Sequence, residues 1–279
     1  MLYICIPTFN EAPTVGVLLW RIRKVFQDYS REYEVIVYDD GSTDDTAAML
    51  EPYAKVLPLT VIRSEERNGY GHALNALCHR VAKRTRYPRR DAMIVLQGDF
   101  TDQPEALPEL AKRFEGGADI VIAERERTGM PVAVRRLAQW GPWMVRPFVS
   151  SGEVVDPFGA FRLYRIALLR DYIKAAPGTP FVTGDGWAAN LELLVKLKPF
   201  ARRIERLGVT PCYDLRPRET RVRPFADAMS LYRAGRASRT WRVNPPANRS
   251  TSPSASPPGS TPGSTPGSTP DSAPVSTPS

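Results

Sequence analysis

Short apolar runs alternate with stretches of helical period along the first half of the chain. Runs such as LYICIP at 2–7 and AMIVL at 92–96 are apolar without interruption, which predicts strands buried on both faces. The segments between them carry apolar residues three and four positions apart, which predicts amphipathic helices. This alternation is typical of a mostly parallel sheet with helices on both faces, so we predict an α/β fold. The predicted strands are 2–7, 34–38, 59–62, 92–96 and 119–123, and the predicted helices are 14–26, 44–53, 72–83 and 104–114.

The pattern becomes looser after residue 123. The segment 135–148 is basic and aromatic, with Trp140, Trp143 and Phe148 among arginines. Such a mixture fits a surface at a membrane interface, but it also fits an ordinary amphipathic helix packed on the sheet. Both interpretations stay open. The remaining predicted elements are strands at 158–163 and 203–211 and helices at 187–196 and 227–234.

Charge and composition divide the chain near residue 243. The 279 residues carry 38 Lys and Arg against 30 Asp and Glu, a net charge of +8. Residues 244–279 hold one arginine and one aspartate, so the whole excess lies in 1–243. The same segment is rich in Ser, Thr, Pro and Gly and repeats Gly-Ser-Thr-Pro three times, which predicts disorder. We therefore expect one domain at 1–243 and a disordered tail at 244–279.

Hydropathy and cysteine content favour a cytoplasmic protein. No window approaches the ~18 consecutive apolar residues of a transmembrane helix, and the first residues do not resemble a signal peptide. The three cysteines are widely spaced and form no CxxC pair, which favours reduced, buried thiols over disulfides or a zinc site. The basic charge alone suits nucleic acid, anionic lipid or phosphorylated small molecules, so peripheral contact with the cytoplasmic face of a membrane stays open.

Polar loops follow four of the predicted strands, at the point where each strand ends. Because ligands bind at the carboxyl ends of strands in open parallel sheets, these loops are expected to line one crevice. Aspartate and glycine also make turns and caps, but the adjacent carboxylates at 39 and 40 exceed what a turn needs. The chain has neither GxGxxG after its first strand nor a P-loop, so carboxylates would hold any nucleotide. The loops are PTFNE at 7–11, DDGSTD at 39–44, RNGYG at 67–71 and QGD at 97–99.

Five motifs in the chain carry a resemblance to a known family. They are IPTFNEAPTV, VIVYDDGSTDDT, RNGYGHALN, VLQGDFTDQPE and DPFGAFRLYR. The chain resembles the family 2 glycosyltransferases, nucleotide-diphospho-sugar enzymes with the GT-A fold, over about residues 2–235. Within that family it is most similar to the dolichol-phosphate and polyprenyl-phosphate sugar synthases. The resemblance implies a GT-A domain with a nucleotide-sugar-binding half at 1–125 and an acceptor-binding half at 126–243.

The resemblance also implies roles on the donor side. Phe9 and Glu11 match the family's PxYNE-like start, in which the Glu contacts the nucleoside and a Tyr is common at the position of Phe9. The DDGSxD element, matched at 39–44, holds base and ribose, and Arg67 stands where the synthases place a Lys before Gly-x-Gly. The residues expected to bind the nucleotide sugar are Pro7, Phe9, Glu11, Asp39, Asp40, Arg67, Gly98, Arg162 and Arg218.

The implied metal site departs from the family pattern. Asp99 matches the last Asp of the metal-binding DxD, but Gln97 stands at the first. An amide oxygen can bind Mg²⁺ or Mn²⁺, although losing one anionic ligand weakens the hold on a hard cation. We expect Asp99 and Gln97 to contact Mg²⁺ or Mn²⁺. Either the phosphates of the sugar nucleotide supply the missing charge, or the protein is a weak enzyme.

Arginines and two carboxylates form the implied acceptor side. One guanidinium can bind two phosphate oxygens at once, so these arginines favour a phosphate-bearing acceptor. The alternative is a solvated basic surface. A phosphate is already an anion and needs no base. A hydroxyl acceptor would need one, and Asp156 or Asp185 is the candidate, although either fits a turn or a cap equally well. The residues expected in catalysis are Asp99, Arg125, Arg136, Asp156 and Asp185.

Three hypotheses for the function follow from these residues. The first is inverting transfer of mannose or glucose from a GDP-mannose or UDP-glucose type donor to a polyprenyl or dolichyl phosphate. The second is a soluble family 2 transferase with a hydroxyl acceptor in cell-surface glycan synthesis. The third is a non-catalytic protein that binds nucleotide sugars or anions, suggested by Gln97 and the net charge. Nothing in the sequence indicates a nucleic-acid partner or an oligomeric state.

Overall fold

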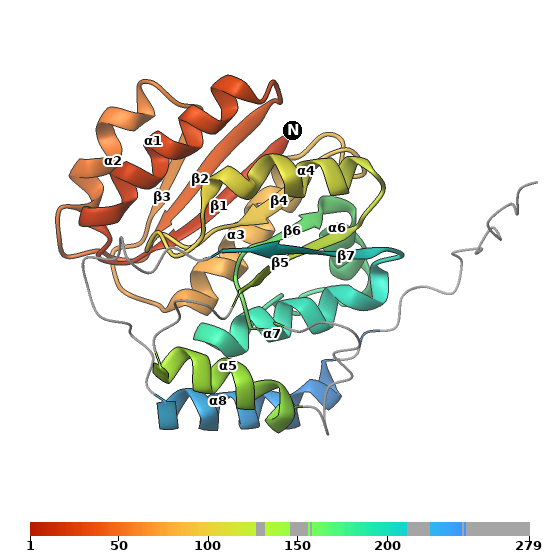
Figure 1. Ribbon diagram of the computed structural model, residues 1–279. Coiled ribbons are helices and arrows are strands. Elements are labelled where there is room, and N and C mark those ends of the chain that lie inside the picture. Colours follow the sequence, from red (N-terminus) through yellow and green to blue (C-terminus); the bar gives the residue numbers. More distant parts are fainter. Residues whose placement is uncertain (127–131, 146–155, 157, 211–223, 242, 244–279) are drawn as a thin grey trace, which may run out of the picture. The chain divides into compact units, whose positions relative to one another are not determined.

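A mixed sheet of seven strands forms the centre of the computed structural model, which describes residues 1–126, 132–145, 156, 158–210, 224–241 and 243 (Figure 1). The strand order is β3-β2-β1-β4-β6-β5-β7, and β6 runs antiparallel to both of its neighbours. The other pairs are parallel, so the predicted α/β fold is confirmed. The strands are β1 (Leu2–Thr8), β2 (Tyr33–Asp39), β3 (Leu59–Arg63), β4 (Ala92–Val95), β5 (Ile120–Arg125), β6 (Arg162–Arg165) and β7 (Ile204–Val209).

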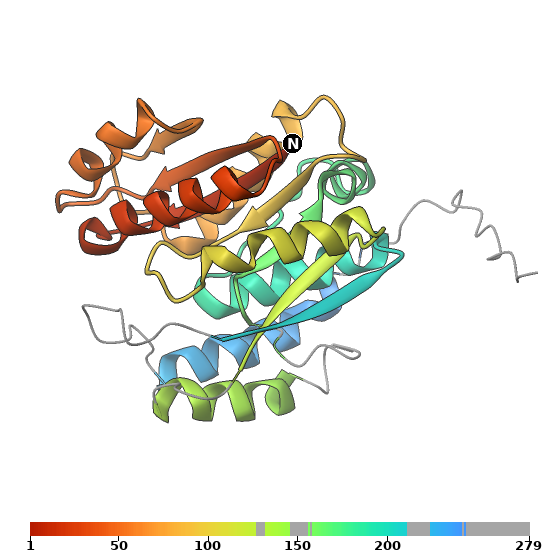
Figure 2. The same ribbon diagram turned by 45° about the horizontal axis from the view of Figure 1, so that its top comes forward.

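Helices cover both faces of this sheet (Figures 1 and 2). Alternate residues of a strand point to opposite faces, and β1 therefore feeds two cores. Leu2, Ile4 and Ile6 pack with α1 and α4, whereas Tyr3 and Cys5 pack with α3, α6 and α7. The helices are α1 (Ala12–Asp28), α2 (Thr46–Ala54), α3 (Tyr70–Arg84), α4 (Leu107–Glu115), α5 (Val132–Val145), α6 (Ile166–Ala175), α7 (Gly186–Leu197) and α8 (Pro224–Ala237).

Two elements differ from the sequence prediction. The strand expected at 158–163 is β6 at Arg162–Arg165, and α6 follows it directly although no helix was expected there. Both ends of β6 are arginines, which is unusual for a buried strand. Arg162 is buried, and Arg165 pairs with Asp119 at 2.6 Å. The ion pair of Arg165 and the hydrogen bonds of Arg162 compensate for burying charge in a strand that lies between β4 and β5.

Cys5 and Cys78 are buried free thiols, as expected, and burial raises the pKa of both. Cys212, Arg218 and the tail at 244–279 lie outside the described residues. No helix in the described part of the chain has the length and apolar content that crossing a bilayer requires.

Candidate active site

The loops after β1, β2 and β4 meet at the carboxyl ends of these strands. The backbone N–H of Asn10 donates to Ser42 Oγ at 2.9 Å, which joins the first loop to the second. Thr14 Oγ1, in the first turn of α1, donates to the carbonyl of Gly98 at 2.8 Å. A Cβ on Gly98 would lie 2.9 Å from the side chain of Thr8, so only glycine lets the third loop approach β1 this closely. The structure therefore brings together the loops that were expected to line one crevice.

Asp39 and Asp40 are both buried, but their carboxylates make different contacts. Both oxygens of Asp40 accept backbone N–H bonds, from Asn68 at 2.9 Å and Gly69 at 2.7 Å. Asp39 Oδ1 accepts the N–H of Ser42, whereas its Oδ2 accepts no hydrogen bond from any residue the structure describes and forms an ion pair with Arg63 Nε at 3.5 Å. The charge of Arg63 compensates for part of the cost of burying this oxygen, and a ligand N–H or O–H would supply the hydrogen bond that it lacks. Asp39 is thus the better candidate for contact with a base or ribose, and Asp40 shapes the loop before α3.

Phe9, in the loop after β1, and Arg67, in the loop before α3, form a stacked pair. The guanidinium carbon of Arg67 lies 4.1 Å from the centre of the Phe9 ring, and the Arg67 side chain is exposed. Two flat groups, one cationic, provide stacking surfaces for a nucleobase. The structure therefore joins two residues that the resemblance placed at the nucleotide.

Pro7 and Glu11 are buried beneath the loops rather than open to them. Pro7 lies inside β1, where it pairs with Tyr38. Glu11 precedes α1, and its carboxylate accepts a hydrogen bond from Thr14 Oγ1 at 3.2 Å. Both residues support the shape of the crevice.

Gln97, Arg125 and Asp102 form a hydrogen-bonded group next to Asp99. Arg125 donates from Nε and Nη2 to the two oxygens of Asp102, at 2.8 and 2.9 Å, and from Nη2 to Gln97 Oε1 at 3.0 Å. Burial raises the pKa of Asp102, and the positive charge of Arg125 counteracts that rise. Sequence reasoning missed Asp102, because nothing in the spacing marks it as the partner of an arginine on another strand.

This group decides which residues suit a divalent metal. A guanidinium has only donors, so the Gln97 atom that meets Arg125 is the amide oxygen, the one atom of that side chain able to bind a metal. Asp99 is half-buried, and its Oδ1 accepts the N–H of Thr101 at 3.0 Å. In the described part of the chain, no three His, Cys, Asp or Glu side chains gather as a metal site. Because Gln97 Oε1 already accepts a hydrogen bond from Arg125, we expect Asp99 to be the main protein contact of a metal, and the ligand role of both residues stays a prediction.

Arg162 differs from its expected role. It is 1% exposed, and it donates to two backbone carbonyls, Asn190 at 2.7 Å and Asp156 at 3.1 Å. The guanidinium therefore ties β6 to α7 instead of lining the crevice. Its Nε is buried without a hydrogen-bond partner among the described residues.

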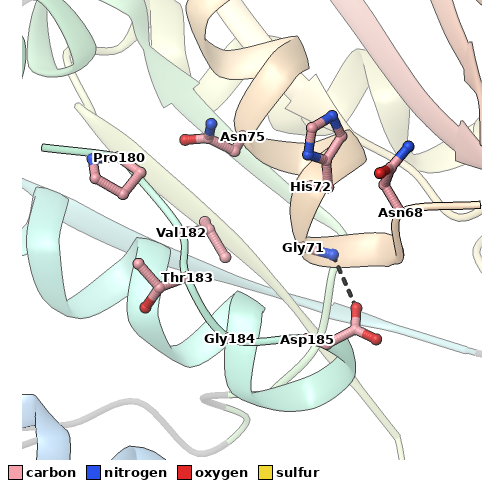
Figure 3. A pocket seen from close by; sticks show the side chains of 9 residues that line it. All are labelled: Asn68, Gly71, His72, Asn75, Pro180, Val182, Thr183, Gly184 and Asp185. Atoms are coloured by element: carbon pink, nitrogen blue, oxygen red, sulfur yellow. Dashed lines mark hydrogen bonds between the residues drawn. The ribbon is translucent and has the colours of Figure 1, made fainter. Parts of the chain in front are cut away.

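The two candidate bases, Asp156 and Asp185, both accept hydrogen bonds from backbone N–H groups. Asp156 Oδ1 accepts from Phe158 at 3.1 Å and from Gly159 at 2.8 Å, just before β6. Asp185 Oδ1 accepts from Gly71 at 2.9 Å, in the first turn of α3 (Figure 3). Asp185 remains exposed beside a polar cavity of about 360 Å³ that His72, Asn75 and Thr183 also line.

A buried ion pair fixes the loop that carries Asp185. Glu192 Oε2 accepts the backbone N–H groups of Thr183 and Gly184, both at 2.9 Å. Glu192 Oε1 accepts from Lys196 Nζ at 2.7 Å, and Lys196 also donates to the carbonyl of Pro180 at 2.9 Å. Both partners of the pair are buried in α7, and their hydrogen bonds hold the backbone of the loop before Asp185.

Arg136 is exposed on α5, and its expected catalytic role stays a prediction. Arg218 belongs to the segment 211–223, outside the described residues. Its expected phosphate contact stays a prediction.

The sheet order and the loops at its carboxyl edge define a protein of the GT-A class. Residues 3–173 match Glycosyl transferase family 2, and the chain belongs to that family. A dolichol-phosphate mannosyltransferase of Pyrococcus furiosus is 27% identical over 201 residues, which are 70% of this chain and 52% of that protein. A prophage bactoprenol glucosyl transferase homolog of Escherichia coli K12 is 30% identical over 163 residues, which are 57% of this chain and 50% of that protein. The chain thus spans about half the length of these curated relatives.

Solved structures confirm the fold. The glucosyl-3-phosphoglycerate synthase of Mycobacterium tuberculosis, determined with Mn²⁺, UDP and phosphoglyceric acid, superposes with a TM-score of 0.60. That match is 20% identical and covers 88% of this chain and 80% of the other. A Staphylococcus aureus protein, TarS 1–349 in complex with UDP, has a TM-score of 0.52 at 21% identity, over 84% of this chain and 64% of the other.

Proposed function

We propose that this chain transfers a hexose, mannose or glucose, from a nucleoside-diphosphate sugar to a polyprenyl or dolichyl phosphate, with inversion. The curated relatives named for dolichol phosphate and bactoprenol support the acceptor class. The observation that carries the proposal is that Asp156 and Asp185 both accept backbone N–H bonds. These bonds give each carboxylate a structural role, one just before β6 and one at the first turn of α3, so neither needs a role as a base to explain its position. A phosphate acceptor needs no base, and a hydroxyl acceptor does.

The donor would occupy the crevice at the ends of β1, β2 and β4. Its base would stack on the Phe9–Arg67 pair, and a base N–H or a ribose hydroxyl would donate to Oδ2 of Asp39, which accepts no hydrogen bond from the described residues. Its diphosphate would lie near Gly98 and Asp99. Donors of the GDP-mannose and UDP-glucose types both fit this description, because a buried carboxylate accepts from either base or ribose.

Transfer then needs only two bond changes. An oxygen of the acceptor phosphate attacks the anomeric carbon and forms the new C–O bond. The bond from that carbon to the nucleoside diphosphate breaks, and its electron pair leaves with the diphosphate. Arg125, held by Asp102, supplies positive charge next to the developing anion. A bound Mg²⁺ or Mn²⁺ would add positive charge at the diphosphate, with Asp99 as its protein contact.

A transfer assay with paired acceptors tests the proposal. The full chain is incubated with GDP-mannose or UDP-glucose and either a short-chain polyprenyl phosphate or the matching polyprenol. We expect a glycosyl phosphate product from the phosphate only, and we expect Asp185→Asn to keep most of the activity. Product from the polyprenol, or an inactive Asp185→Asn enzyme that still folds, would overturn the proposal.

A hydroxyl acceptor is the second candidate function. It is favoured by one observation, the exposed carboxylate of Asp185 beside the polar cavity of Figure 3. In that case a hydroxyl-bearing acceptor would bind in the cavity, and Asp185 would take up its proton. The assay above separates the two candidates.

A further inference from the structure

The outer side of α5 and α8 carries large side chains that the fold does not cover. Trp140 is 59% exposed and Trp143 69%, and their rings meet edge to face with centroids 6.5 Å apart. On α8, Met229 is 52% exposed and Tyr232 41%. The two helices lie side by side beyond α7 in both views (Figures 1 and 2). We call these four residues and their neighbouring arginines the α5–α8 face.

The inner sides of the same helices explain why this face is left open. A Cβ on Gly141 would lie 2.6 Å from the ring of Phe158 and 3.5 Å from Leu231, so α5 approaches closely through its glycine. Phe158, Leu191 and Leu231 form a small buried cluster against α7. Each helix therefore already has an apolar side buried in the protein. Two tryptophans on the opposite side contribute nothing to that packing.

The charge on this face has one sign. Arg135 and Arg136 are exposed on α5, and Arg233 and Arg236 are exposed on α8. These two helices contain no acidic residue except Asp227, near the start of α8. An aromatic surface surrounded by arginines suits an anionic, partly apolar partner, and it suits a neutral protein surface less well.

We propose that the α5–α8 face binds the surface of an anionic lipid bilayer. Tryptophan and tyrosine favour the headgroup level of a membrane, because their rings are apolar and carry one polar atom. Arginine keeps its charge at the lipid phosphates while its stem covers apolar surface. The inference rests on the proposed function, since a polyprenyl phosphate acceptor is embedded in a membrane.

The position of α5 relative to Arg125 supports the same partner. The helix begins at Val132, seven residues after Arg125 in the crevice. Even a fully extended link of this length spans no more than about 25 Å. The start of α5 therefore lies within about 25 Å of Arg125, which the proposed function places beside the leaving diphosphate.

Vesicle sedimentation with matched variants tests the proposal. The full chain is mixed with vesicles of phosphatidylcholine alone, or of phosphatidylcholine and phosphatidylglycerol in equal parts. The variants are Trp140→Ala with Trp143→Ala, Arg135→Gln with Arg136→Gln, and Trp20→Ala as control. Trp20 is 51% exposed but lies on α1, away from the face. Thermal melting checks that each variant folds.

We expect binding to the anionic vesicles, weakening with salt. The affinity of the double tryptophan variant for these vesicles should be lower by roughly tenfold or more. That of the double arginine variant should be lower by about 30-fold at low salt. Trp20→Ala should bind like the original chain. Absence of binding by the original chain, or equal binding by the double tryptophan variant, would overturn the inference. So would a dimer that the tryptophan changes convert to monomer, because the face would then bind a second copy.

A transfer assay without vesicles separates this inference from the proposed function. On a short, water-soluble polyprenyl phosphate, the double tryptophan variant should retain the original rate. If the original chain binds anionic vesicles but transfers no sugar to any polyprenyl phosphate, the proposed function fails and the membrane surface stands. If the original chain transfers sugar but does not bind vesicles, the proposed function stands and the membrane surface fails.

Discussion

Replacing Arg125 with methionine would leave a buried carboxylate without its partner. Asp102 is 1% exposed at its side chain and Arg125 is 10% exposed, and their closest atoms are 2.7 Å apart. Methionine keeps much of the length and apolar volume of the arginine stem and removes its charge. Breaking a buried ion pair from one side typically costs about 3–5 kcal/mol. We expect the free energy of unfolding at neutral pH to fall by about that amount.

The loss should depend on pH, and its sign follows from Asp102. Burial raises the pKa of this carboxyl, so the folded protein binds a proton where the unfolded chain has released it. Stability linked to such a group is highest at low pH and falls as pH rises through the folded pKa. Removing Arg125 takes away the charge that lowers this pKa. The pKa of Asp102 in the folded variant should then be higher still, and the pH range over which stability falls should be wider. The methionine variant should therefore be closest to the original protein in acid and weakest above neutrality.

Urea denaturation at about pH 5 and about pH 8 measures both effects. Lys112→Met is the control, because Lys112 and Glu109 form an exposed pair 3.9 Å apart. Exposed pairs are worth about 0.2–1 kcal/mol. Two results would refute the reasoning: a loss in Arg125→Met no larger than in Lys112→Met, or an equal loss at both pH values. Adding Asp102→Leu to Arg125→Met should recover much of the stability, because no charge is then buried.

Three further predictions concern the packing and the site. Gly71→Ala would place a Cβ 1.9 Å from the carbonyl oxygen of Gly184. It should lower the free energy of unfolding by about 1–3 kcal/mol in urea titrations, whereas Gly208→Ala, with open space around it, should change little. Glu192→Gln should cost about 3–5 kcal/mol in the same assay, because Lys196 stays buried and charged, and a stable variant would contradict the role given to this pair. Gln97→Leu should leave the Mn²⁺ affinity of the protein–UDP or protein–GDP complex unchanged by calorimetry, and Asp99→Asn should reduce it; a large loss in Gln97→Leu would show that the amide does bind metal.

Local patterns in the sequence predicted the fold and the meeting of the loops that follow its first strands. Continuous apolar runs mark buried strands, and polar loops after them mark the carboxyl edge, so β1, β2 and β4 and their loops lie where expected. The strand β6 and the helix α6 were misplaced or missed, because β6 carries two arginines whose partners are distant in sequence. The helix then follows without a glycine or proline to mark its start.

Roles within the site were less predictable, because they depend on partners that the sequence does not place. Asp39 and Asp40 are adjacent and alike in sequence, yet Asp40 uses both oxygens on a neighbouring loop, whereas Asp39 keeps an oxygen that pairs only with Arg63 among the described residues. Asp102 gains its importance only from Arg125, which lies 23 positions away. Arg162 matches a family motif but holds backbone carbonyls. In each case the role depends on which polar atoms folding brings together, and the sequence alone does not show this.

Binding of a nucleoside diphosphate at Asp39 is the most direct test of the crevice. Thermal melting of the full chain is measured with UDP and with GDP, for the original protein, Asp39→Asn and the exposed control Asp28→Asn. A ligand at about 100 times its Kd stabilises the folded state by about 2.7 kcal/mol. The account predicts that one nucleotide raises the melting temperature of the original protein and of Asp28→Asn, and that Asp39→Asn loses most of this shift. No shift with either nucleotide, or an undiminished shift in Asp39→Asn, would contradict it.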